Sequence, residues 1–324
     1  VTHRVQSLIE KHGVNPSSIL VITFTRAAAR EMKERFERLM EGRPMRGQVS
    51  FGTFHSVFFR ILKLAYQYDA SDIIREDQKL RVIRELTAKE QLEPEDENEL
   101  ISFLLSEISA VKGEQIDLEH YYAKSCSGDS FRRIYRGYEE QLQRAHKIDF
   151  DDMLVMCWEL FRKRPDILSA WQKKYEYILV DEFQDINRLQ YQIVRMLAAP
   201  SDNLFIVGDD DQSIYRFRGA KPEIMLGFER DYPKAARVLL DVNYRSTREI
   251  VEASLRLIEH NEKRFKKSLK TAGSRGRGVI TRIWEDEEEE NSRIAEEIRM
   301  YAEAGCSYSD IAVLYRTNSG PKRL

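Results

Sequence analysis

The chain has 324 residues, of which 42% are hydrophobic and 33% are charged, and its formal net charge is −2. Such a length holds two or three domains with a sizeable core, and the composition is ordinary for a globular protein with many exposed helices. The small net charge removes gross electrostatics as an argument for nucleic-acid binding, which must rest on local clusters and aromatic side chains.

The sequence contains little that indicates a membrane span, a signal peptide or disulfide bonds. No run reaches the roughly 18 apolar residues of a membrane span, and the first residues of the sequence have an amphipathic pattern, not that of a signal peptide. The cysteines Cys126, Cys157 and Cys306 lie far apart without metal-ligand spacing, and an odd number argues against a disulfide framework. We therefore expect buried or inert thiols in a reducing compartment, a cytoplasmic location and no membrane partner.

The first part of the chain alternates between helical and strand patterns. A short apolar run predicts a buried strand, whereas apolar residues at helical period predict an amphipathic helix. The expected elements are a helix (2–12), a turn (15–18), a strand (19–24), a helix (26–40), a strand and loop (49–55) and a helix (56–68).

Between residues 69 and 147 the sequence has no convincing strand pattern. Helical runs are separated there by polar breaks such as residues 93–97 and 125–129. This stretch is therefore expected to be an all-helical insertion, followed by two helices over 150–162 and 165–173.

The stretch Ile178-Leu-Val-Asp-Glu-Phe-Gln-Asp185 carries an apolar run straight into carboxylates. It is typical of a buried parallel strand that delivers Asp181 and Glu182 to its carboxyl end, where open α/β sheets place their ligands. One of two adjacent acids can hold Mg²⁺, directly or through water, and the other can polarise an attacking water. After a helix over 187–197, a second strand from Leu204 also ends in acids and Gln212.

After Tyr232-Pro233 the sequence enters a new unit. We expect strands over 238–241, 279–284 and 311–315, with helices over 247–260 and 291–304 between them. Strands that alternate with helices predict a parallel α/β sheet, and three strands leave an open edge, which suggests a unit that is cut off. The acid run Asp286–Glu290 is expected to be a solvated helix start favoured by the helix dipole.

Five blocks stand out in order along the chain. They are residues 23–32 (TFTRAAAREM), 51–56 (FGTFHS), 181–185 (DEFQD), 207–220 (VGDDDQSIYRFRGA) and 240–246 (LDVNYRS). In this order and spacing they are specific, and the chain resembles the UvrD/Rep-type superfamily 1 DNA helicases over essentially its whole length.

The resemblance implies an α/β fold of RecA-like parallel-sheet motor domains with an all-helical insertion. The boundaries that follow are the first motor domain in two parts (1–68 and 148–235), the helical insertion (69–147) and the start of a second, truncated motor domain (236–324). It also implies an ATP-dependent DNA helicase that moves 3′ to 5′, with ATP and Mg²⁺ as cofactors. Its DNA partners would be single strands and single/double-strand junctions. The pathway, whether repair, replication restart or plasmid copying, and the protein partners stay open.

By the same resemblance, Asp181 is the Mg²⁺-site carboxylate and Glu182 the base that activates water. Gln212 senses the γ-phosphate. From the second motor domain, Tyr244 stacks on adenine and Arg245 reaches the γ-phosphate, where a fixed guanidinium can stabilise transition-state charge. A further nucleotide contact is expected from Arg218.

Aromatic side chains next to arginines can stack unpaired bases and hold phosphates. Tyr215 and Phe217 have this setting, although one of them could instead belong to the core, and many relatives carry Trp in place of Phe217. The resemblance adds DNA contacts, whose residues are Phe24, His55, Thr25 and Thr53. For Phe24 the competing interpretation is a core residue that ends its strand. The basic loop over 263–277 is more typical of a solvated face than of a DNA contact.

The phosphate-loop pattern Gly-x-x-x-x-Gly-Lys-Ser/Thr does not occur in the 324 residues. In the family this loop precedes the helix that begins here at Thr2, so we expect a fragment that is inactive alone. Two alternatives remain open. One is a non-catalytic relative that binds DNA or a protein, and the other is the motor part of a helicase-nuclease. An unrelated P-loop kinase or GTPase would not carry Tyr215, Phe217 and Tyr244-Arg245 in these blocks.

Overall fold

The computed structural model describes residues 1–92, 94–199, 201–213 and 219–315. It divides into two compact units. The first comprises Val1–Arg237 together with Lys263–Phe265, and the second comprises Val238–Glu262 together with Lys266–Leu324.

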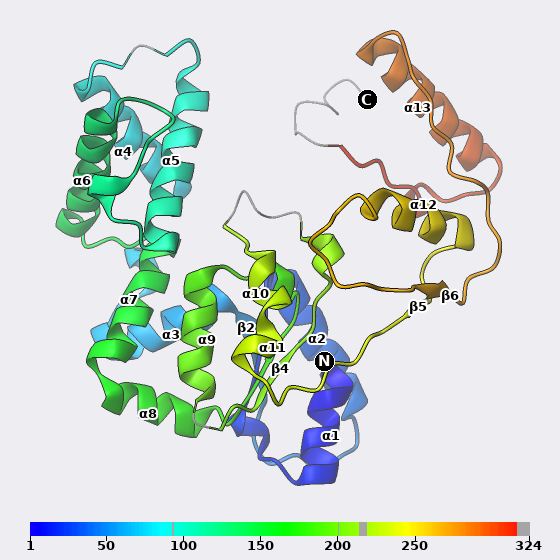
Figure 1. The fold of residues 1–324 in the computed structure, drawn as a ribbon, viewed down its shortest axis with the longest axis horizontal. Coiled ribbons are helices and arrows are strands. Elements are labelled where there is room, and N and C mark those ends of the chain that lie inside the picture. Colours follow the sequence, from blue (N-terminus) through cyan, green and yellow to red (C-terminus); the bar gives the residue numbers. More distant parts are fainter. Residues whose placement is uncertain (93, 200, 214–218, 316–324) are drawn as a thin grey trace. The chain divides into compact units, whose positions relative to one another are not determined.

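A parallel sheet of four strands forms the centre of the first unit (Figure 1). The strands are hydrogen-bonded in the order β2-β1-β3-β4. Its strands are β1 (Ile19–Thr23), β2 (Ser50–Thr53), β3 (Tyr177–Val180) and β4 (Leu204–Ile206). All residues of β1 are buried, as expected for a strand that has neighbours on both sides and helices on both faces. The sequence prediction of an α/β protein with a parallel sheet is therefore confirmed.

Successive residues of β1 and β3 enter two different hydrophobic cores, because side chains alternate across a strand. On one face, Leu20, Ile22, Ile178 and Val180 pack with α3 (Phe54–Tyr66), α7 (Phe150–Lys163) and α9 (Arg188–Ala198). On the other face, Ile19, Val21 and Leu179 pack with α1 (Thr2–His12) and α2 (Arg26–Leu39). The layers fix the direction of each strand and hence the position of its carboxyl end.

The remaining helices of the first unit are α4 (Glu76–Lys89), α5 (Glu97–Glu114), α6 (Gly128–Arg144), α8 (Pro165–Lys174), α10 (Pro222–Leu226) and α11 (Phe228–Asp231). Of these, α4, α5 and α6 form a separate bundle beyond one end of α7 (Figure 1). This bundle has its own core, which includes Ile83, Leu104, Phe131 and Tyr138. The described residues between 69 and 147 contain no strand, so the expectation of helices alone in this stretch is confirmed.

A buried ionic cluster joins the bundle to α7. The Lys112 ammonium of α5 lies 2.9 Å from Asp149, 2.7 Å from Asp152 and 2.6 Å from Glu139. Asp149 also accepts a hydrogen bond from the Tyr138 hydroxyl at 3.0 Å. Since Asp149 caps the first turn of α7, the cluster ties the bundle to the start of a helix that packs on the sheet.

The second unit contains α12 (Arg248–Ile258), α13 (Glu287–Glu303) and a parallel pair, β5 (Val242–Asn243) with β6 (Lys270–Thr271). The acid run does begin a helix, since Asp286 caps α13 by accepting from the Glu289 amide. The strands predicted over 238–241, 279–284 and 311–315 are not formed in the described residues. Strand pairing begins later than expected, at Val242, where the Asp241 carbonyl oxygen accepts from the Lys270 amide of β6 at 2.7 Å. Leu240 and Ile283 are 79% and 94% exposed.

One boundary also differs from the sequence prediction. The helix expected to start at residue 56 begins at Phe54, so His55 lies in the first turn of α3 and not in a strand or loop. Thr53 causes this early start, because its side chain caps the helix by accepting from the Ser56 amide. Within the described ranges of the chain, the helices are too short or too polar to cross a bilayer.

Candidate functional site

The carboxyl ends of β1, β3 and β4 lie at one edge of the sheet. The register pairs Ile22 with Val180 and Val180 with Ile206. The Asp181 amide extends this ladder by donating to the Ile22 carbonyl oxygen at 2.9 Å. The predicted placement of Asp181 and Glu182 just past a buried parallel strand is therefore confirmed, next to the ends of two other strands.

Asp181 is half-buried at this edge. Burial, and next the negative charge of Glu182, raises the pKa of its carboxyl above the ordinary value. A divalent cation would offset both effects. No group of three or more His, Cys, Asp or Glu in the described part of the chain could hold a metal ion. The donor set suits Mg²⁺ held by one carboxylate together with phosphate and water oxygens.

Glu182 adopts the left-handed backbone conformation, with φ 51°. This conformation is uncommon for a residue with a side chain and costs on the order of 1 kcal/mol. It turns the chain sharply between the end of β3 and the short helical turn Phe183–Asp185, which is buried. The turn leaves Glu182 exposed while the three residues after it enter the core.

Gln184 connects this turn to the loop after β4. Its Nε2 donates to Glu182 Oε2 at 2.8 Å, and its Oε1 accepts from the Asp209 amide at 3.0 Å. Asp209 Oδ2 accepts in turn from Gln212 Nε2 at 2.8 Å. The structure thus links the predicted base, Glu182, with the predicted phosphate sensor, Gln212. Sequence reasoning did not single out Gln184, although an amide inside an acidic block was a usable signal.

Four residues expected to contact DNA lie at or just after the ends of β1 and β2. Thr25 caps α2 by accepting from the Ala28 amide at 3.1 Å, and Thr53 caps α3. A capping hydroxyl uses an acceptor site, which is compatible with donating its own proton to a phosphate. Phe24 is half-buried. This exposure is higher than that of a core residue and lower than that expected of a residue that contacts a base.

His55 is half-buried, and its ring meets the ring of Phe150 edge-on with 5.1 Å between centroids. Burial, against an opposing contribution from Asp149, lowers the pKa of His55 to about 4. The imidazole is therefore neutral at physiological pH. It can offer a hydrogen bond or a ring face to DNA, but it does not supply a positive charge.

The predicted contacts Tyr215, Phe217 and Arg218 lie outside the described residues. The described chain on the near side of that segment is held to the acidic turn, because the Ser213 hydroxyl donates to the Gln184 carbonyl oxygen at 3.4 Å. On the far side, the Lys221 amide donates to the Ile186 carbonyl oxygen at 3.1 Å. Both anchors belong to the segment that carries Glu182.

In the second unit, Asn243 organises the turn that carries Tyr244 and Arg245. Its Oδ1 accepts from the amides of Arg245 and Ser246, at 2.9 and 2.8 Å. Tyr244 is 82% exposed, so its ring is available to stack on a planar ligand. The predicted roles of this pair stay predictions.

Part of the basic run 263–267 is engaged within the first unit. Arg264 donates from Nε and Nη2 to the two carboxylate oxygens of Asp211, at 2.8 and 2.6 Å. The Phe265 amide donates to Asp210 Oδ2 at 2.7 Å. Arg264 is therefore not on the solvated face that the sequence predicted. Its guanidinium forms a bidentate ion pair with Asp211.

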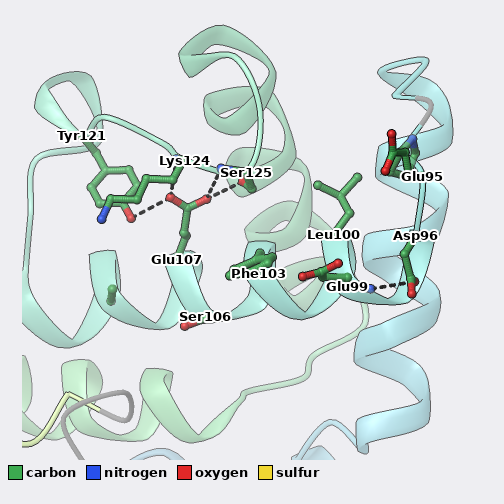
Figure 2. Close-up of a pocket in the computed structure, with 12 residues that line it drawn as sticks. Glu95, Asp96, Glu99, Leu100, Phe103, Ser106, Glu107, Tyr121, Lys124 and Ser125 are labelled. Atoms are coloured by element: carbon green, nitrogen blue, oxygen red, sulfur yellow. Dashed lines mark hydrogen bonds between the residues drawn. The ribbon is translucent and has the colours of Figure 1, made fainter.

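The helical bundle contains an open hollow of about 580 Å³ between α5 and the segment 121–125 (Figure 2). Glu107 points toward the segment 121–125 (Figure 2). Its carboxylate accepts from the Tyr121 hydroxyl at 3.1 Å and from the Lys124 amide at 2.7 Å. It also accepts from the amide and hydroxyl of Ser125. These bonds explain the buried carboxylate as a structural anchor, and the hollow lies apart from the strand edge.

Comparison with known proteins matches both units. Residues 1–233 match the model of the UvrD/REP helicase N-terminal domain, and residues 238–324 match that of the UvrD-like helicase C-terminal domain. The chain is 37% identical to YjcD of Bacillus subtilis, with 100% of this chain and 43% of that protein aligned.

Two further relatives are named ATP-dependent DNA helicase PcrA. The one from Staphylococcus epidermidis is 37% identical, and the one from Staphylococcus aureus is 36% identical. In both cases the alignment covers 98% of this chain and 44% of the relative. The chain therefore spans less than half the length of the curated relatives it matches.

Proposed function

The chain belongs to the UvrD/REP helicase family, and on that premise we propose that it provides motor parts of an ATP-dependent DNA helicase. The helicase would couple ATP hydrolysis to 3′ to 5′ movement along single-stranded DNA and to duplex unwinding at single/double-strand junctions. The proposed parts are the first motor domain (1–68 and 148–235), its helical insertion (69–147) and the start of the second motor domain (236–324).

One observation carries this proposal. The acidic turn after β3 and the Gln212 loop after β4 are joined by hydrogen bonds at a single sheet edge. Hydrolysis of a nucleoside triphosphate needs a cation ligand, a group that activates water and a group that senses the γ-phosphate, all within one site. Asp181, Glu182 and Gln212 supply these chemical types on adjacent strand ends.

In the proposed reaction, Asp181 would hold Mg²⁺, which neutralises charge on the phosphates when bound. Glu182 would orient water and accept its proton while the water oxygen bonds to the γ-phosphorus and the bond to the ADP oxygen breaks. Gln212 would contact the γ-phosphate. Arg245 and Tyr244 would complete the site from the second motor domain, with a further contact from Arg218.

DNA would be held by aromatic stacking and by short polar contacts. Phe217 and Tyr215 would stack on bases, and Phe24 and the neutral ring of His55 would add contacts near the same strand ends. Thr25 and Thr53 would donate to phosphates. Movement of the two motor domains relative to each other during the ATP cycle would then advance the strand.

The test is ATPase activity of the full-length gene product with saturating single-stranded DNA. Glu182→Gln should abolish most turnover while nucleotide binding persists, because the amide cannot take the proton from water but Asp181 still holds the metal. Glu176→Gln is the matched control, since Glu176 is exposed just ahead of β3 at its opposite end. Turnover of Glu182→Gln within about threefold of the parent would overturn the assignment.

Polarity is tested separately with duplexes that carry a single-stranded tail on either the 3′ or the 5′ side. Unwinding that requires the 3′ tail is expected. Equal unwinding of both substrates, or a preference for the 5′ tail, would contradict the proposed direction and leave the ATPase assignment intact.

A further inference from the structure

We propose that Gln184 is the positioning residue of the hydrolytic base, which holds the Glu182 carboxylate in place and ties it to the loop that carries Gln212. The inference rests on the proposed function, because it assigns a role to the partner of Glu182. It goes beyond that function by naming a residue that touches neither nucleotide nor DNA in the proposed site.

The chemistry of the two partners fixes how the Gln184 amide is oriented. Glu182 Oε2 is a carboxylate oxygen, which accepts hydrogen bonds, so the group 2.8 Å from it must be the NH₂ of Gln184. The Asp209 backbone amide is a donor, so the group 3.0 Å from it must be the carbonyl Oε1. Only a side-chain amide of this length offers a donor to one and an acceptor to the other.

Burial makes this arrangement rigid. Gln184 is 2% exposed, so water has little access to its amide and cannot take over the role of that group in holding the exposed Glu182 carboxylate in one orientation. An amide in such a position has few alternative rotamers, because core side chains are closely packed around it. The bond to Glu182 is also charge-assisted, which makes it stronger than a bond between neutral groups.

Gly208 supplies the space that the amide needs. A Cβ atom at residue 208 would lie 2.7 Å from Gln184 Oε1 and 3.1 Å from the Phe183 backbone nitrogen. Both distances are too short for a side chain to be accommodated without movement. Glycine at this position therefore lets the loop after β4 approach the Gln184 carbonyl oxygen closely enough to donate to it.

The arrangement couples the base to a loop on the neighbouring strand. Asp209 uses its amide to bind Gln184 and its carboxylate to bind Gln212. A displacement of this loop must break the bond to Gln184 or move the amide, and the amide is in turn bonded to Glu182. Gln212 and Glu182 therefore respond to the same loop position, through a contiguous set of hydrogen bonds.

The decisive experiment is a double-mutant cycle with Gln184→Met and Glu182→Gln, read as DNA-stimulated kcat of the full-length gene product. Gln184→Met should lower kcat by about 10- to 100-fold, the size of one lost hydrogen bond to a charged group, with the Kd for a fluorescent ATP analogue unchanged. In the Glu182→Gln background the same change should lower kcat by less than about twofold, because the base it positions is already gone.

A matched control separates positioning from loss of a buried amide. Gln190 is also a buried glutamine, and its Oε1 accepts from the Asn187 amide at 3.0 Å at the start of α9. Gln190→Met should change thermal stability, and any effect on kcat should be the same in both backgrounds. Gln184→Glu is a second probe, since it keeps an acceptor for the Asp209 amide but presents an acceptor to Glu182; it should lower kcat as Gln184→Met does.

The outcomes separate the two proposals. An equal loss from Gln184→Met in both backgrounds, or no loss in either, overturns the positioning role and leaves the function of Glu182 standing. Turnover of Glu182→Gln near the parent value overturns both. If Gln184→Met does not fold, Gln184→Glu decides the matter by the same cycle.

Discussion

Lys112→Met removes the ammonium that contacts Glu139, Asp149 and Asp152 in the cluster that joins the helical bundle to α7. The side chains of Lys112 and Asp149 are 3% and 2% exposed, so water cannot replace the lost ion pair. Methionine has a similar volume and unbranched shape, which limits the packing defect to the charge itself. The variant therefore tests how much of the junction depends on electrostatics.

The expected loss in the free energy of unfolding arises because the variant leaves buried carboxylates without a cationic partner. Breaking a buried ion pair by removing one member costs about 3–5 kcal/mol. The contact to Glu139 contributes least, because that side chain is 41% exposed. Lys89→Met, an exposed lysine at the end of α4, is the matched control and should change stability by less than about 0.5 kcal/mol.

The pH dependence gives the sharper test. In the parent, burial and then the charge of Asp149 already raise the pKa of Asp152 to about 7. Burial opposes ionisation of Asp149 as well, but Lys112 holds the pKa of that carboxyl below its ordinary value. Without the ammonium, the carboxylates should bind protons more tightly in the folded than in the unfolded state. The stability of Lys112→Met should therefore fall as pH rises from about 5 to 8, more steeply than in the parent.

Urea unfolding at pH 5, 6, 7 and 8 measures this, with Trp158 and Trp171 of the first unit as fluorescent reporters in a Trp284→Phe background. Adding Asp152→Asn to Lys112→Met should restore part of the loss at pH 8, because one unpaired charge is removed. A loss below about 1 kcal/mol at pH 7, or a loss that is the same at every pH, would refute the reasoning about buried charge.

Three further outcomes are expected. Phe217→Ala should weaken single-strand binding by roughly 1–3 kcal/mol per stacked base in fluorescence anisotropy and uncouple ATPase from unwinding; unchanged affinity and unwinding would place the ring outside the DNA path. Burial and then the charge of Glu182 raise the pKa of Asp185 to about 6, so its stability contribution is lost as pH rises through that value, and Asp185→Asn should flatten urea stability between pH 4 and 7; an unchanged slope would contradict this. The purified 324-residue chain should release little phosphate, because its sequence has no phosphate loop, and robust turnover abolished by Glu182→Gln would show the opposite.

The sheet of the first unit could be predicted from sequence because its two central strands, β1 and β3, are short apolar runs buried on both faces. The residues of β1 and β3 carry this signal on their own, and their carboxyl ends place Asp181 and Glu182 without further information. The cluster around Lys112 could not be predicted in this way. Its lysine and aspartates are 37 and 40 residues apart in the chain, and only the packing of α5 on α7 brings them together.

The second unit shows where an apolar pattern is insufficient. Residues 238–241 and 279–284 have the composition of strands, yet neither run forms a strand in the described chain, and the pair β5–β6 begins only after Asp241. A strand depends on hydrogen bonds from another segment, whereas a helix such as α13 satisfies its own backbone and has a local cap at Asp286. Periodicity therefore predicted the helices of this unit better than its strands.

The candidate site has one part that a single strand determines and another part that depends on a neighbouring segment. Positions of Asp181 and Glu182 follow from one strand, but the environment of Glu182 depends on Gln184 and on the loop that begins at Gly208, which comes from the next strand of the sheet. A substitution at Gly208 should thus act on Glu182 through Gln184 although the two residues are distant in sequence. Gly208→Ala should lower kcat as Gln184→Met does, and combining the two should add little, since both disturb the same hydrogen bond.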